Sequence, residues 1–308
     1  MFVHALRRIA ESPIDVGRPD DSSWAAHVGR RTTEESSVDA GRRLDPTPQR
    51  PPSWNPTIEN VPGCGGLYGI ERANELARSG EPVLLLGTPT THILLPDRLG
   101  DSAALNTLFQ PLIGLGNAPS LLLVSPALRV HSLAELIAMA KRTPLVYASA
   151  GTGQTIHVAT ALFCRQAGIR MSHQPYDDGS ASAYADLIAG RVHVYFDNLL
   201  GCLDRVRQRQ VVPLAVWDTT RSDGLPEVPT LAETGIPAHA LDTWMGVFGA
   251  NRAHAAVELA QSAVLDPRFR DELRKLGLSG GPIDAGALAA RVAKSAPGWR
   301  RAWEAVDA

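Results

Sequence analysis

Short apolar runs alternate with amphipathic helical stretches over the last four fifths of the chain, and this alternation most narrowly limits the possible folds. The runs at 81–88 and 119–126 are continuous and apolar, which is typical of strands covered on both faces. Residues 132–142 carry apolar side chains at helical spacing, and Ser132 with Glu135 makes a capping box at the start. Strands that alternate with helices predict an α/β fold.

The same reading extends to the rest of this region, which shows no internal repeat of 20 to 50 residues. Further strands are predicted at 144–150, 170–176, 191–196, 211–217 and 244–250. Helices are predicted at 156–166, before Gly190, at 200–209, from Thr230 with Glu233 as a capping box, and through the tail at 254–308.

The first 55 residues differ from the remainder. They are rich in Arg, Asp, Ser and Pro and keep no apolar period, so we expect residues 1–55 to be an atypical, poorly ordered segment, with the core beginning at Pro56. The opening 21 residues lack the continuous apolar core of a secretory signal, because Arg7, Arg8 and Glu11 interrupt it. No run approaches the length needed to span a bilayer, so no membrane insertion is expected.

Charge and cysteine content exclude several classes of function. A formal net charge of -2 gives no strong field for nucleic acid or for anionic lipid, so neither is expected as a partner. Cys64, Cys164 and Cys202 are widely separated and form no CxxC pair, which predicts neither a metal site nor a redox motif. We expect buried cysteines, with a bridge between Cys164 and Cys202 as the alternative in an exported protein.

Two loops could hold an anion. The segment SAGTGQTIH at 149–157 places glycines between a strand and a helix, where main-chain N–H groups at a helix N-terminus can face one negative charge. It lacks the full glycine pattern and the lysine of nucleotide-binding loops, so no nucleotide and no other cofactor are expected. The loop GTPTTH at 87–92 offers threonine hydroxyl groups that suit a carboxylate.

Polar residues elsewhere leave alternatives open. Asp197 ends a strand, where it could orient a ligand or cap the following helix. Asp177 and Asp178 lie in a turn whose composition is typical of structural turns. His92 and His157 are each compatible with a structural role or with a general base. No HExxH, GxSxG or paired metal-ligand spacing occurs, which favours binding over catalysis and predicts no metal.

Several ordered motifs together resemble a known family. They are ENVPGCGG, LLLGTPTTHILLP, YASAGTGQTIHVATALF, HQPYDDGSASAYADLIAGRVHVYFDN and LPEVPTLAETGI, which span roughly residues 56 to 308. In this order they resemble the Bug-type solute receptors of tripartite tricarboxylate transporters. The resemblance implies a type II periplasmic-binding-protein fold, in which two α/β lobes close like a Venus flytrap on a carboxylate. It also implies a monomeric receptor that presents an organic acid to a membrane permease.

The resemblance further implies domain bounds and a ligand set. Lobe 1 would comprise residues 56–119 plus 243–308, and lobe 2 residues 120–242. The ligand contacts would be Thr88, Thr91 and His92 from lobe 1, and Ser149, Ala150, Gly151, Thr152, Gln154, Tyr176, Gly179, Ser180, Asp197 and Asn198 from lobe 2. The implied location is the periplasm, or the cytoplasm if Met1 is the true start.

Two departures from the family pattern bear on the ligand. Only a trace of the family's first ligand loop is visible at 17–27, and Asp177 with Asp178 stand where the family usually has a lysine. The added negative charge lowers the expected affinity for multiply charged acids or indicates a ligand with an amine. The alternatives to a transport receptor are an enzyme for a small acid, with His92 or His157 as base beside Asp197, and a ligand sensor.

Overall fold

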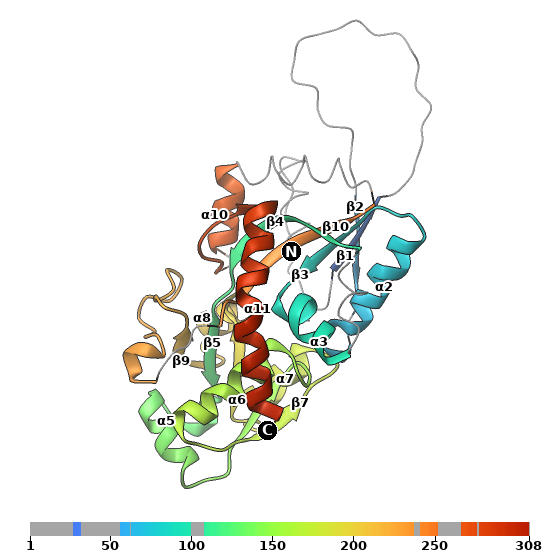
Figure 1. The fold of residues 1–308 in the computed structure, drawn as a ribbon. Coiled ribbons are helices and arrows are strands. Elements are labelled where there is room, and N and C mark those ends of the chain that lie inside the picture. Colours follow the sequence, from blue (N-terminus) through green and yellow to red (C-terminus); the bar gives the residue numbers. More distant parts are fainter. Residues whose placement is uncertain are drawn as a thin grey trace, which may run out of the picture.

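The computed structural model describes residues 27–31, 56–61, 63–99, 108–236, 241–251, 266–275 and 277–307. These residues form two α/β lobes, each built on its own β-sheet and joined by strands that cross between them (Figure 1). The predicted α/β fold class is confirmed.

The sheet of the first lobe has six strands in the order β11-β4-β10-β3-β1-β2, and every neighbouring pair is antiparallel. Its strands are β1 (His27–Arg31), β2 (Pro56–Asn60), β3 (Val83–Gly87), β4 (Gln110–Asn117), β10 (Trp244–Ala250) and β11 (Ile283–Asp284). Its helical segments are η1 (Cys64–Gly66), α2 (Leu67–Arg78), the π-helical turn η2 (Thr90–Leu94), α3 (Leu95–Leu99), α10 (Pro267–Lys275) and α11 (Ala285–Asp307).

The sheet of the second lobe has five strands in the order β7-β6-β8-β5-β9, with parallel pairs around β6 and antiparallel pairs around β5. Its strands are β5 (Ser120–Val124), β6 (Val146–Ser149), β7 (Ser172–Pro175), β8 (Val194–Asn198) and β9 (Val212–Trp217). Its helical segments are η3 (Pro126–Leu128), α5 (Leu133–Ala140), α6 (Thr155–Ala167), α7 (Ser180–Ile188), α8 (Leu199–Arg207) and η4 (Ala232–Thr234).

The connection between the lobes is short and hydrogen-bonded. Strand β4 ends at Asn117 and β5 begins at Ser120, so the chain passes directly from one sheet to the other. The Asn117 side chain donates to Asp218 at 2.8 Å and accepts from the Thr243 hydroxyl at 2.9 Å. Helix α11 also joins the lobes, because it packs against β4 and η2 of the first lobe and against α6 of the second (Figure 1).

Apolar burial explains why the strands sit where they do. All five residues of β5 and all seven of β10 are buried, as expected for central strands that have no solvent-facing side. The Ser132 hydroxyl accepts from the main-chain N–H of Glu135, which confirms the predicted cap of α5. The Glu135 carboxylate reaches back to the N–H of His131 rather than to that of Ser132.

Most predicted elements are confirmed, with three corrections. The strand expected at 191–196 runs over Val194–Asn198, because Arg191 and Val192 instead bond back to the end of α7. Thr230 and Glu233 do form a reciprocal capping box, but only the 3₁₀ turn η4 follows, because Gly235 ends it with φ 85°. The tail holds the strand β11 as well as helices.

The N-terminal expectation also needs correction. Residues 1–26 and 32–55 lie outside the described part of the chain, but residues 27–31 form β1, which lies between β2 and β3. The six-stranded sheet therefore includes a strand before Pro56. The cysteine prediction is confirmed for two residues, since Cys164 and Cys202 are buried free thiols rather than a bridged pair.

Candidate ligand-binding site

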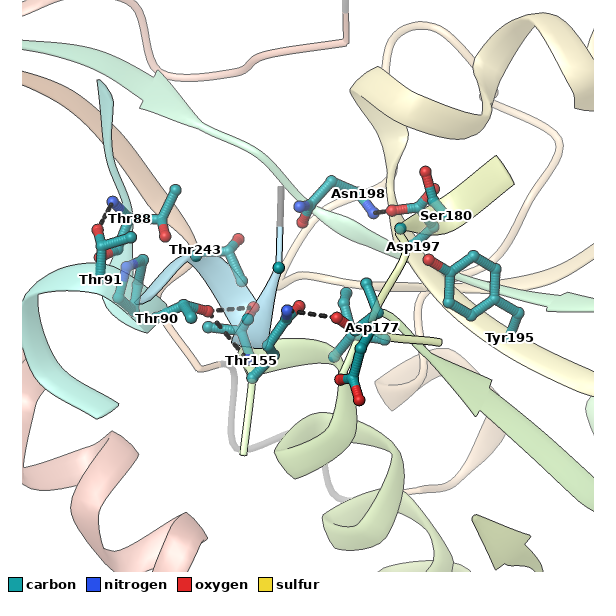
Figure 2. A pocket seen from close by; sticks show the side chains of 18 residues that line it. Thr88, Thr90, Thr91, Thr155, Asp177, Ser180, Tyr195, Asp197, Asn198 and Thr243 are labelled. Atoms are coloured by element: carbon teal, nitrogen blue, oxygen red, sulfur yellow. Dashed lines mark hydrogen bonds between the residues drawn. The ribbon is translucent and has the colours of Figure 1, made fainter. Parts of the chain in front are cut away.

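A pocket of about 830 Å³, measured to its open mouth, lies where the two lobes meet. Both lobes contribute to its lining: Gly63, Gly65, Gly66, Thr88, Pro89, Thr90, Thr91 and Thr243 from the first, and Ala150, Gln154, Thr155, Ile156, Asp177, Gly179, Ser180, Tyr195, Asp197 and Asn198 from the second. Figure 2 shows the labelled threonines of the first lobe on one side and Tyr195, Asp197 and Asn198 on the other.

The first lobe approaches the pocket with a glycine turn and a threonine loop. Gly65 and Gly66 have φ 70° and 96°, a backbone that only glycine adopts without strain, and they lead into α2. The threonine loop follows β3, where the Thr91 hydroxyl accepts from the main-chain N–H of Thr88 at 3.0 Å. Both segments bring main-chain N–H groups and hydroxyls, which are neutral donors, to the pocket wall.

Four helices begin at this pocket, and none of them is capped by the side chain of its own N-cap residue. The N-cap residues are Gly66 of α2, Gln154 of α6, Gly179 of α7 and Asn198 of α8, and each lines the pocket without accepting a hydrogen bond from its helix through its side chain. No acidic residue lies in the first turn of any of these helices. The positive ends of four helix dipoles therefore converge on one volume, which favours a negatively charged guest.

The lobes touch each other directly beside this volume. Thr90 of the first lobe accepts from the main-chain N–H of Thr155 at 3.1 Å and donates its hydroxyl to the Thr155 hydroxyl at 3.2 Å. A Cβ atom placed on Gly65 would lie 3.0 Å from Cγ of Gln154. The arrangement is thus a closed one on this side, held by a first-lobe side chain at the N-terminus of α6.

Asp197 is buried at the second-lobe side of the pocket, with 3% of its surface exposed. Its carboxylate accepts from the Tyr184 hydroxyl at 2.6 Å and from the main-chain N–H of Asn198 at 2.8 Å. Burial raises the pKa of Asp197 to about 6, although both hydrogen bonds lower it. Of the two sequence interpretations, the structure disfavours helix capping, since Asn198 is the N-cap of α8 and the Asp197 side chain bonds only that N–H and Tyr184.

The charge of the pocket wall is unusual for an anion site. Asp177 and Asp197 are the charged residues of the described lining, which contains no lysine, arginine or histidine. Within the described lining, the groups that can hold a ligand's negative charge are main-chain N–H groups and neutral side chains. In the described residues no cluster of three His, Cys, Asp or Glu side chains is arranged to bind a metal.

The structure brings eight of the predicted ligand residues to the pocket. These are Thr88, Thr91, Ala150, Gln154, Gly179, Ser180, Asp197 and Asn198. They come from segments up to 110 positions apart in the sequence and meet because β3, β6 and β8 end at the same cleft. Their binding role stays a prediction.

Five predicted residues lie outside the lining. The Ser149 hydroxyl is buried and bonds the carbonyl of Gly151 and the ring of His173. Gly151 is buried beside Asp177 and Gln154, Thr152 is exposed, and the Tyr176 hydroxyl donates to Asp186 at 2.5 Å. His92 points into the core.

The histidines proposed as bases are both engaged elsewhere. His92 stacks on Phe248 with ring centroids 3.7 Å apart, and burial lowers the pKa of His92 to about 3. His157 accepts from the N–H of Gly153 at 3.1 Å and stacks on His173 at 4.0 Å. Neither ring lines the pocket, so neither is positioned as a base beside Asp197.

Sequence reasoning missed part of the lining. The glycines of the ENVPGCGG motif and the residues Thr90, Thr155 and Asp177 stood in segments already singled out, so the signal was present. Tyr195 also stood in a motif already singled out, whereas Thr243 had no such signal. The position of Thr243 depends on how the strands cross between the lobes.

Comparison with known proteins identifies the chain's relatives. Residues 55–297 match the TctC model, described as the tripartite tricarboxylate transporter family receptor. A UPF0065 protein from the tcbD-tcbE intergenic region of Pseudomonas sp. (strain P51) is 28% identical over 301 residues, which cover 82% of this chain and 87% of that protein. BugT of Bordetella pertussis (strain Tohama I / ATCC BAA-589 / NCTC 13251) is 30% identical over 195 residues, covering 62% of this chain and 59% of that protein.

Solved structures give the same fold. R. palustris Rpa4515, whose structure was solved with adipate, is 29% identical with a TM-score of 0.69, and the match covers 78% of this chain and 83% of that one. The periplasmic binding protein BugD, 22% identical, has a TM-score of 0.70 over 81% of this chain and 86% of that one. The fold is thus that of periplasmic binding proteins, with two α/β lobes around a ligand cleft.

One negative finding concerns the membrane. Among the described helices, none combines the length and apolar character that a bilayer span requires.

The family match covers well over half of the residues. This chain belongs to the tripartite tricarboxylate transporter receptor family and is a solute-binding receptor of the Bug type.

Proposed function

We propose that this receptor captures a small organic carboxylate between its lobes in the periplasm and presents it to a membrane permease, without chemical turnover. The observation that carries the proposal is the convergence on one pocket between the lobes of four helix N-termini, none of which is capped by its own N-cap side chain. Main-chain N–H groups there replace water around a carboxylate, and the threonine hydroxyls complete its shell. The adipate seen with Rpa4515 supports a carboxylate as the class of guest.

We further propose the lobe boundaries from the paths of the strands. The first sheet draws on residues before Ala118 and after Thr243, and the second on residues 120–217. A division into 56–119 plus 243–308 and 120–242 agrees with these paths, and β1 adds residues 27–31 to the first lobe. Closure of one lobe on the other would then turn about the crossing near Asn117 and Thr243 and would also alter the contact of α11 with α6 and the Thr90–Thr155 bonds.

The test is native mass spectrometry of the purified protein, followed by thermal unfolding with the acid that it retains. A ligand at a hundred times its Kd stabilises the folded state by about 2.7 kcal/mol. We expect the purified protein to retain a carboxylic acid, and we expect that acid to raise Tm by this stabilisation of the folded state. If no organic acid is retained and none of a broad panel raises Tm, the proposal is refuted.

A charge variant locates the site within the molecule. Asn198→Asp adds a negative charge at an N-cap inside the pocket, while aspartate remains a good N-cap residue, so folding should be preserved. We expect it to weaken binding of the retained acid at least about tenfold, through repulsion in the cleft. The control is Gln210→Glu, an exposed position just after α8, which should bind as the unaltered protein does.

A further inference from the structure

We propose that the ligand of this receptor is a zwitterionic aminocarboxylate, and that Asp177 determines this specificity by pairing with the ligand's ammonium group. The inference rests on the proposed function, since it concerns the same pocket. It starts from an imbalance of charge. Helix N-termini supply sites for one carboxylate, but the side chains of the described lining add two further carboxylates and no cation.

The two aspartates differ in what they can still bind. Asp197 has both carboxylate oxygens engaged, by Tyr184 and by the main chain of Asn198. Asp177 lines the same pocket but forms no hydrogen bond and no ion pair with any residue that the structure describes. Its carboxylate is therefore the acceptor that remains available to a ligand.

The position of Asp177 brings this acceptor close to the anion end of the pocket. Its Oδ1 lies 3.0 Å from the point where a Cβ atom of Gly151 would stand, and Nε2 of Gln154 lies 3.3 Å from that same point. Gln154 is the N-cap of α6. A guest whose carboxylate faces the start of α6 can thus have a nitrogen within reach of Asp177, so both charges of a zwitterion find an opposite partner.

The described pocket lining places no cationic side chain beside Asp177. The nearby imidazole of His173 is half-buried between Tyr147 and His157, and burial lowers the pKa of His173 against the opposing attraction of Asp177. A second carboxylate on the ligand, as in a dicarboxylic acid, would meet an unneutralised like charge at Asp177. An ammonium group there would be attracted instead.

The neighbouring Asp178 is not placed to pair with the ligand's ammonium group as Asp177 is. Asp178 is exposed, as Asp177 is, but it accepts from the Ser182 hydroxyl at 2.5 Å and lies outside the pocket lining. It carries the same charge in the same turn, but it contributes to the start of α7 rather than to the cleft. Asp178→Asn is therefore a matched control for Asp177→Asn.

The experiment is isothermal titration of the full chain near pH 7 with a four-carbon set: butanoate, 2-aminobutanoate, 4-aminobutanoate and succinate. We expect one aminobutanoate to bind at least about tenfold more tightly than butanoate and succinate, as a charge-assisted pair in a cleft allows. Asp177→Asn should remove this preference and Asp178→Asn should keep it. Asp177→Lys should reverse it in favour of succinate.

Three results would separate the possible failures. If succinate or butanoate binds as tightly as both aminobutanoates, the inference is overturned while the receptor function stands. If the amino preference survives in Asp177→Asn, another group reads the nitrogen and the assignment of Asp177 is overturned. If neither this set nor the matched three-carbon and six-carbon sets bind, the proposed function fails together with the inference.

Discussion

Replacing Asp197 with asparagine should change how the stability of this receptor depends on pH. Burial raises the pKa of this carboxyl from 3.8 to about 6 in the folded protein. The folded state therefore holds the Asp197 proton more tightly than the unfolded state does. As pH rises from about 4 to about 6, the unfolded chain ionises first, so the Asp197 contribution to stability falls across this window.

The magnitude follows from the shift itself. A pKa difference of roughly two units at about 1.4 kcal/mol per unit corresponds to about 3 kcal/mol lost between pH 4 and pH 7. Because Asp197 is 3% exposed, solvent screening removes little of this amount. Asparagine carries no titrating group, and it can still accept from the N–H of Asn198 while its amide faces the Tyr184 hydroxyl.

The assay is urea unfolding of the unaltered protein and of Asp197→Asn at several values between pH 4 and pH 8. The difference in free energy of unfolding, Asp197→Asn minus the unaltered protein, should rise by about 3 kcal/mol across the window. Above the window this difference should stay constant. Tyr184→Phe removes a donor that lowers the pKa of Asp197. The free energy of unfolding of this variant should therefore go on falling to a higher pH than that of the unaltered protein. A difference between Asp197→Asn and the unaltered protein that stays flat from pH 4 to pH 8 would refute the reasoning.

Three further results are expected. Thr90→Val deletes the two Thr90–Thr155 bonds between the lobes and should weaken ligand binding by roughly thirtyfold in titration calorimetry, at about 1 kcal/mol per bond, whereas Thr152→Val outside the lining should not. Gly65→Ala should lose binding as well as about 1 kcal/mol of stability, while Gly168→Ala, at a similar φ of 63° with open space around it, should lose stability alone. His92 should keep a neutral imidazole from pH 5 to pH 8 in NMR titration, since burial lowers the pKa of that ring to about 3, and an imidazole that titrates in this range would contradict the burial argument.

The opposing effect of His92 on stability makes the variant comparison necessary. Its lowered pKa means that the folded state binds that proton less tightly than the unfolded state, so its contribution to stability is lost as pH falls from about 6.5 towards 3. This slope has the opposite sign to that of Asp197 over the shared range. Only the difference between the unaltered protein and Asp197→Asn isolates the carboxyl.

The sequence predicted helices and strands well where a continuous apolar run or a capping residue marks the element within a few positions. The continuous apolar runs of β5 and β10 and the Ser132 cap of α5 are decided within a few residues of sequence. Strand β4 was missed because QPLIGLGN mixes glycine, proline and apolar residues without alternation, and its pairing with β10 is interrupted by register shifts. The helix expected after Thr230 failed because Gly235 stops it after one turn.

The site was predictable only as far as its loops are local. The loop after β3 lines the pocket, but it winds into the π-helical turn η2, so Thr91 reaches the pocket while the next residue, His92, is directed into the core. Thr243 reaches the pocket because β10 pairs with β4 at the crossing between lobes. No pattern within one segment carries that information.

A crystal structure of the protein with its retained acid tests the central claim most directly. A carboxylate between the lobes, with oxygens within hydrogen-bonding distance of main-chain nitrogen atoms in the first turns of α6, α7 or α8, is the predicted result. An acid bound by cationic side chains outside this pocket, or a pocket in which those N–H groups face away from the guest, would contradict it.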